Sequence, residues 1–302
     1  MKGRERSPVC SGSSLPPPPR PLQVARNAMQ RGLVGEAGPW GATLVRFLFG
    51  LPFSVAIFGV VMTLTPDAAP NPTARFWVAA VVGAISQVAA TGALLMAMRR
   101  SGFAVAILLQ QSSLPMAAVI GWLVLGDALG AGAWAGVALG TLGLAVLSWP
   151  RPGQARADLP GGLLGLASGA AFAVAFNAFR QAGLAFDAGH PLYSAAAALV
   201  TAQAMQSVVL TLILAVLRPQ ALRSVMGSWR TSLAAGAFGS AASACWFGAL
   251  ALAPAAPVRA IGLIEGPIAA AVGRRLFREA LTPRQWMGGG LTAIGVLLTV
   301  LS

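Results

Sequence analysis

Long runs without a charged residue constrain this chain more than any other feature of its sequence. Eight runs of 18 or more residues are separated by charged residues: 47–66, 76–98, 101–126, 128–150, 159–179, 191–217, 231–258 and 285–302. A helix that rises about 1.5 Å per residue needs about 20 residues to cross the hydrocarbon core of a bilayer. Each run is therefore predicted to span the membrane. We count a ninth span between Pro254 and Phe277, although it contains Arg259 and Glu265.

The spans are predicted to be helices. Only 10% of the residues are charged, whereas soluble domains usually carry about 25%. The runs also lack the alternation of polar and apolar residues that a membrane β-barrel shows. Small residues recur at a spacing of four, a pattern typical of closely packed membrane helices. They are Gly132, Gly136 and Gly140 in one run and Gly161, Gly165 and Gly169 in another.

The second half of the chain repeats the first. Residues 115–148 align without a gap to residues 267–300, at an offset of 152, with ten identical positions. The identities include Pro115 with Pro267 and Trp134 with Trp286, and the acidic Asp127 faces Glu279. Five spans per repeat would place the two copies in opposite orientations. Such inverted repeats are the common plan of secondary transporters.

The amino terminus departs from this plan. Residues 1–21 include four consecutive prolines and no apolar core, which predicts a disordered tail rather than a signal peptide. Residues 22–34 are too short to span a bilayer. Asn177 lies about fifteen residues into the run that begins near Leu159, whereas its counterpart Asn27 has no full run before it. We therefore expect a ten-helix plan whose first helix is truncated or replaced, which leaves about nine full helices.

The sequence resembles the EamA-like families of the drug/metabolite transporter superfamily. The doubled proline-to-glycine pattern carries the resemblance, together with Asp127 and Glu279 and the segment from Asn27 to Phe47. The resemblance implies two repeats, at 22–150 with an incomplete first helix and at 159–302. It also implies a secondary transporter that exports or imports a small organic metabolite or drug by alternating access. A proton or a counter-solute is the expected coupling partner.

Other classes of function are less compatible with the residues. The chain has one His and lacks HExxH and GxSxG, so we expect no enzyme, catalytic residue, metal or cofactor. The net charge of +13 comes from residues that stand mostly in short loops, which favours membrane topology over nucleic-acid binding. Two alternatives remain open: an inactive truncated transporter and, less favoured, a membrane-embedded enzyme.

The basic residues also predict an orientation. If the tail stays on the side where the chain begins, that side collects 17 of the 21 Lys and Arg residues. Loops rich in Lys and Arg stay in the cytoplasm. We expect a multi-pass protein of the bacterial inner-membrane type, with a cytoplasmic amino-terminal tail and an external carboxyl terminus.

Polar residues inside spans are costly and are therefore functional candidates. Glu265 lies near the middle of its span and precedes Gly266 and Pro267. A carboxylate there would titrate protons or pair with a cation, because low dielectric raises its pKa. The alternative is a buried ion pair with Arg259.

Arg46 lies about six residues into its predicted span. It could bind an anionic substrate, but snorkelling to the interface is the favoured interpretation. Six amides could line a polar path or serve as hydrogen-bonding contacts between helices. They are Gln87, Gln110, Gln111, Asn177, Gln203 and Gln206.

The remaining candidates are aromatic residues and prolines. Trp246 lies deep enough in its span to stack on a ligand. Tyr193 and His190 lie near the start of a span, where anchoring at the interface is the better interpretation. Pro115 and Pro267 occupy matching repeat positions and are predicted hinges or kinks.

Overall fold

The computed structural model describes residues 37–126, 130–148, 155–187, 189–252, 255 and 282–301. All regular structure within these ranges is helical, which confirms the predicted all-α membrane protein. Six segments are long and apolar enough to cross a membrane: Ala37–Leu64, Ala74–Ser101, Val105–Leu125, Leu159–Phe186, Pro191–Leu217 and Trp229–Leu252. Two shorter apolar helices are Ala131–Gly143 and Trp286–Thr299. The predicted tail and partial first helix lie outside the described residues, as does the predicted ninth span apart from Ala255.

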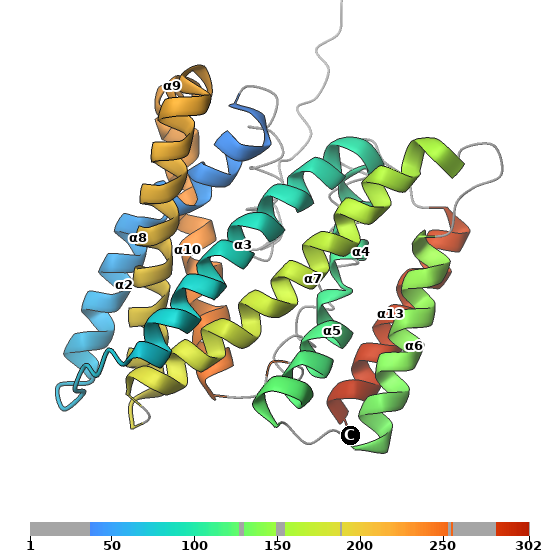
Figure 1. Ribbon diagram of the computed structural model, residues 1–302, viewed down its shortest axis with the longest axis horizontal. Coiled ribbons are helices and arrows are strands. Elements are labelled where there is room, and N and C mark those ends of the chain that lie inside the picture. The colour runs from blue at the N-terminus through green and yellow to red at the C-terminus, as the bar shows by residue number, and fades with distance from the viewer. Residues whose placement is uncertain are drawn as a thin grey trace, which may run out of the picture.

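Figure 1 shows the arrangement of the helices. In chain order they are α2 (Leu51–Leu64), α3 (Ala74–Ser101), α4 (Phe103–Gln110), α5 (Ser113–Ile120), the π-helix Gly121–Leu125, α6 (Ala131–Ser148), α7 (Ala155–Phe186), α8 (Pro191–Leu217), α9 (Pro219–Gly227), α10 (Trp229–Leu252) and α13 (Pro283–Leu301). A further helical stretch, 37–48, precedes α2. The long α7 crosses the centre of the molecule, with α2, α8 and α10 on one side and α6 and α13 on the other.

Glycines let α7 pack closely against its neighbours. A methyl group on Gly165 would lie 2.7 Å from Cβ of Leu109 in α4, and one on Gly169 would lie 3.0 Å from the backbone nitrogen of Ser113 in α5. On α3, the Ala90 carbonyl accepts a 2.8 Å hydrogen bond from Ser168. The predicted glycine face of this helix is therefore confirmed as a close-packing surface.

The helices α6 and α13 pack as an antiparallel pair through glycines. A methyl group on Gly136 would collide with the Gly295 carbonyl, and one on Gly143 would lie 2.7 Å from the Gly288 carbonyl. At the repeat offset of 152, Gly288 is the counterpart of Gly136 and Gly295 is the counterpart of Gly143. The two contacts are therefore equivalent, as a twofold axis between the repeats requires.

Two predicted boundaries were wrong. The first described span is Ala37–Leu64 rather than 47–66, because Arg46 lies inside a helix and its charge does not mark an end. The span predicted at 159–179 continues to Phe186, past Arg180. In both cases the charge-free run is shorter than the helix because one arginine lies within the helix; Arg46 is buried and Arg180 is half-buried.

A proline accompanies the interruption between α4 and α5. Gln111 and Ser112 are not α-helical, and they precede Pro115 in α5. Proline has no backbone N–H, so the Gln111 carbonyl loses its usual partner four residues later. It accepts instead from the Leu114 nitrogen at 3.0 Å. The chain therefore forms a tighter turn here before the α-helix resumes. Polar residues thus lie at a discontinuity within a span.

Candidate functional site

Arg46 is a buried cation between three helical segments. Its side chain is 3% exposed. It donates to the Thr91 hydroxyl in α3 at 3.0 Å and to the Ser243 hydroxyl in α10 at 3.4 Å. The favoured interpretation of Arg46 as an interfacial, snorkelling residue was therefore wrong. The two hydroxyls hold the guanidinium inside the protein, where it cannot reach the aqueous interface.

Aromatic rings stand beside this guanidinium. Phe172 and Phe176 of α7 stack with centroids 5.7 Å apart, and Trp246 of α10 stacks on Phe176 at 6.0 Å. A cavity of about 10 Å³ lies among them, which is room for about one water molecule. It is lined by Arg46, Gln87, Phe172, Phe176, Ser243, Trp246, Phe247 and Leu250. We call this the Arg46 cavity.

Most of the other buried amides near these helices make hydrogen bonds. The Gln87 carbonyl accepts from the Gln206 amide at 2.8 Å. The Gln203 carbonyl accepts from Ser54 at 2.6 Å, and its amide group donates to Ser240 at 3.4 Å. These pairs connect α2, α3, α8 and α10. In this structure they act as contacts between helices, while Gln87 also borders the Arg46 cavity.

Several buried polar atoms without a partner gather at the interruption between α4 and α5, although Oε1 of Gln206 and Oγ of Ser207 in α8 also lack one. Neither polar atom of the Gln110 side chain makes a hydrogen bond, nor do Oε1 of Gln111 and Oγ of Ser112. Farther along α7, the Asn177 amide group donates to the Ala117 carbonyl of α5 at 3.1 Å, but its Oδ1 also lacks a partner. We call Gln110, Gln111, Ser112 and Asn177 the orphan cluster.

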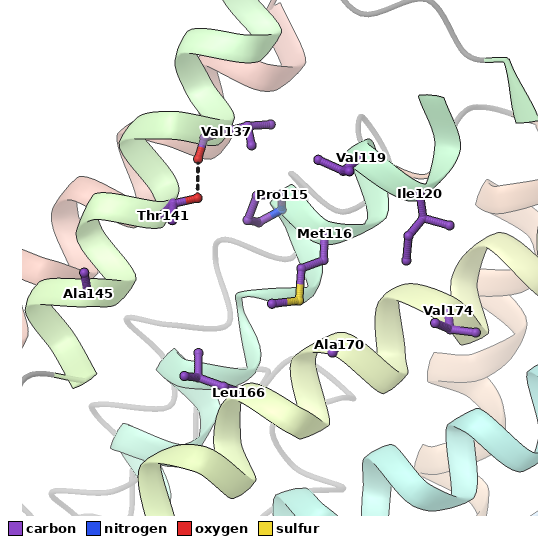
Figure 2. Close-up of a pocket in the computed structure, with 10 residues that line it drawn as sticks. All are labelled: Pro115, Met116, Val119, Ile120, Val137, Thr141, Ala145, Leu166, Ala170 and Val174. Carbon is purple, nitrogen blue, oxygen red and sulfur yellow. Dashed lines mark hydrogen bonds between the residues drawn. The ribbon is translucent and has the colours of Figure 1, made fainter. Parts of the chain in front are cut away.

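A larger cavity is apolar. It has a volume of about 560 Å³ and lies between α5, α6 and α7. Figure 2 shows Pro115 and Met116 facing it, and the Thr141 hydroxyl turned to its own helix, where it donates to the Val137 carbonyl at 2.7 Å. The other lining residues are Val119, Ile120, Ala145, Leu166, Ala170 and Val174. This groove offers almost no group that could orient a polar solute, so we place the candidate site at the Arg46 cavity.

Some of these residues were not singled out by sequence reasoning. Thr91 and Ser243, which hold Arg46, are hydroxyls in apolar helices and give no signal before the helices are placed. Phe172 and Phe176 carry a weak signal, because residues four apart share one helix face. Their identity as a wall of the cavity depends on the packing of α7 against α10.

The sequence candidates are only partly brought together. Arg46, Gln87 and Trp246 meet at one cavity. Gln110 and Asn177 belong to the orphan cluster, and Pro115 lines the apolar groove. Glu265, Arg259 and Pro267 lie outside the described residues. Tyr193, expected at the interface, is buried and its ring contacts Phe58 with centroids 5.4 Å apart.

Comparisons with known proteins agree with the fold. The sequence profile of the EamA-like transporter family matches residues 27–149 and 159–301. A solved crystal structure is similar over 93% of this chain and 94% of its own, at 17% identity and a TM-score of 0.58. At that identity it supports the fold alone. A search of curated proteins finds no match.

Proposed function

Because the chain belongs to the EamA-like transporter family, we propose that it is a secondary transporter that moves a small organic solute by alternating access. The main supporting observation is the buried Arg46 guanidinium, which one repeat contributes and which bonds Ser243 of the other. In inverted-repeat transporters, substrates bind between the repeats. The Arg46 cavity occupies such a position.

The chemistry of the cavity favours an organic anion. A guanidinium provides a permanent positive charge and a planar set of donors that fits a carboxylate or phosphate. The rings of Phe172, Phe176 and Trp246 provide an apolar surface for the rest of the solute. At about 10 Å³ the cavity is too small for such a solute. In the proposed cycle this small cavity belongs to a closed arrangement, and the solute enters when the repeats move apart.

The transport cycle follows from the inverted symmetry. Two repeats of opposite orientation can exchange conformations, and this exchange opens the central site first to one face and then to the other. The glycine contact between α6 and α13 keeps the repeats together during this exchange. Net export or import then depends on the solute gradient and on a coupled proton or counter-solute.

Flux through lipid vesicles tests the proposal. Purified protein is reconstituted, and uptake is measured for a panel of radiolabelled carboxylates and their uncharged amide analogues. We expect carboxylate uptake by the wild type and at least an approximately tenfold loss in Arg46→Gln, since about 1.4 kcal/mol of lost binding has that effect. Arg46→Lys keeps the charge but not the planar donors and should retain part of the uptake.

The control is Arg230→Gln, which removes an arginine that stacks on Trp229 at the start of α10. Its uptake should equal that of the wild type. If vesicles that contain the wild-type protein take up no solute of the panel, the proposal that it transports small organic anions is wrong. If Arg46→Gln folds and transports carboxylates as well as the wild type, the role assigned to Arg46 is wrong.

A further inference from the structure

Gln110 is a buried amide whose hydrogen-bonding capacity is unused. Its side chain is 1% exposed, and neither its nitrogen nor its oxygen has a partner. Burying such a group without compensation costs free energy, and folded proteins rarely retain one without a reason. A leucine at this position would avoid that cost. The retained amide therefore points to a partner that binds in another state of the protein.

Two other residues of the orphan cluster share this property in part. Ser112 and Asn177 each carry a buried oxygen without a partner, and α7 runs beside them in the same direction as α4 and α5. A methyl group on Gly169 would collide with the Ser112 hydroxyl and lie 3.1 Å from the Gln110 carbonyl. Glycine at this position therefore lets the α7 backbone approach the Ser112 hydroxyl and the backbone carbonyl of Gln110.

The helices on either side of the interruption share one hydrophobic cluster with the wall of the Arg46 cavity. Ile107 and Ala117, on either side of the interruption, belong to one hydrophobic cluster with Phe172 and Phe176. These two rings line the Arg46 cavity. A small separation of α4–α5 from α7 would therefore extend the cavity toward Gln110. The interruption gives α4–α5 a point at which it could bend, because the hydrogen-bond ladder is already altered there.

The repeat places a polar residue near the interruption in both copies, although Gln110 itself corresponds to Gly262. At an offset of 152, Pro115 corresponds to Pro267, and Ser113 at the interruption corresponds to Glu265. Both copies thus place a polar residue two positions before the matching proline. Glu265 lies outside the described residues, so this argument rests on sequence alone and is independent of the unpartnered atoms.

We infer that Gln110 lines the water-filled path that opens between α4–α5 and α7, where its amide donates to and accepts from polar groups of the passing solute. The inference rests on the proposed transport cycle. It adds a second, uncharged recognition point to the Arg46 cavity. A solute that bears both an anionic group and a hydrogen-bonding group would use both points.

Cysteine accessibility tests the path without knowledge of the substrate. Cys10 and Cys245 are replaced by serine and alanine, and Gln110→Cys, Leu109→Cys and Ser243→Cys are made singly. Leu109 is also 1% exposed but packs on Gly165, so it is the matched control. Vesicles are treated on both faces with a membrane-impermeant maleimide. We expect Gln110→Cys and Ser243→Cys to react at least about tenfold faster than Leu109→Cys.

The outcomes separate the two proposals. If Ser243→Cys reacts rapidly and Gln110→Cys only as slowly as Leu109→Cys, the Gln110 path is wrong and alternating access at the Arg46 cavity stands. If neither exceeds Leu109→Cys, the alternating-access proposal fails as well. Equal, rapid labelling of all three would show a loosened bundle rather than a defined path and would also overturn the inference.

A stability measurement provides a second test. Gln110→Leu removes an unpartnered amide and should raise the melting temperature in detergent. Gln203→Leu is the matched variant, and it should lower the melting temperature because it removes the partner of Ser54. If Gln110→Leu instead lowers the melting temperature as Gln203→Leu does, the Gln110 amide is already partnered and the inference is wrong.

Discussion

At the scale of single residues, Asp187 ties together two loops that are distant in sequence. Its carboxylate accepts from the Ala69 nitrogen of the α2–α3 loop at 3.1 Å and from the Gly189 nitrogen at 2.9 Å. The His190 ring lies 3.0 Å away. The hydrogen bond with His190, followed by those from the backbone, lowers the pKa of Asp187. The folded protein thus favours the charged carboxylate.

This predicts a pH-dependent contribution to stability. Because the pKa of Asp187 is lowered on folding, its contribution is present above the pKa of the unfolded chain, about 4. The contribution is lost as the pH falls through the lower pKa of the folded protein. Asp187→Asn should therefore melt below the wild type at neutral pH, and the difference should disappear in acid.

Melting curves in detergent between about pH 7 and about pH 2 measure this difference. Asp67→Asn is the control, because Asp67 is an exposed acidic residue of the α2–α3 loop. Its melting temperature should match that of the wild type at every pH. A gap between Asp187→Asn and the wild type that stays constant with pH would contradict the assignment.

Residues of the candidate site were predictable only in part. Arg46, Gln110 and Asn177 were identifiable because polar groups are rare inside spans. Whether each residue is bonded or unpartnered was not predictable. For Arg46 the reason is that Thr91 and Ser243 come from α3 and α10, and only packing brings them to its side chain. The distinction between Gln203 and Gln110, one bonded and one orphan, likewise exists only in three dimensions.

At the scale of helices, the α6–α13 pair depends on glycines, which have no side chain. The backbones approach so closely that methyl groups on Gly136, Gly143 or Gly295 would meet backbone atoms of the partner helix. Membrane helices gain stability from such contacts because van der Waals packing replaces the hydrophobic drive available in water. Thr299 and Thr292 border the contact and bond to the carbonyls of their own helix.

Substitutions along the glycine face of α6 should therefore have opposite effects. Gly136→Ala should destabilise the protein by about 1–3 kcal/mol, the usual cost of overpacking. Gly140→Ala, one turn away, places its methyl group where no atom lies within 4 Å. It should be neutral or stabilise by up to about 1 kcal/mol through helix propensity. Denaturant titration in micelles would compare them; equal effects would show that the helices do not cross here.

Helices were easier to predict than their ends. Length and apolarity identified each described span, since few other structures satisfy backbone hydrogen bonds in lipid. The ends were misjudged where Arg46 and Arg180 interrupt the apolar runs but not the helices. The interruption between α4 and α5 was foreshadowed by Pro115, whose missing N–H acts on the backbone independently of packing.

At the scale of the whole molecule, basic residues gather at one end. The end of α3, the starts of α7, α10 and α13, and the whole of α9 lie at the upper end of Figure 1. These segments carry Arg99, Arg100, Arg156, Arg218, Arg223, Arg230 and Arg284. Arg75 near the start of α3 and Arg180 near the end of α7 lie toward the opposite end, where Arg75 donates to Gln181. This distribution favours a cytoplasmic upper face and an external carboxyl terminus.

Reporter fusions test that orientation. A reporter that works only in the cytoplasm should be silent when fused after Ser302, because α13 ends at the lower face. The same reporter inserted after Gly227, at the end of α9, should be active. Activity at Ser302 together with silence at Gly227 would reverse the orientation, whereas activity at both would contradict the placement of α13.

The reciprocal glycine contact also bears on how such a chain can evolve. Gly136 contacts Gly295, the counterpart of Gly143, and Gly143 contacts Gly288, the counterpart of Gly136. Two identical single-repeat chains would therefore form the same helix crossing as a symmetric dimer. In that dimer one mutation would change both sides at once. In the fused chain each side mutates alone, and Thr292 already stands at the position equivalent to Gly140. Fusion thus allows the two sides of the crossing to diverge independently.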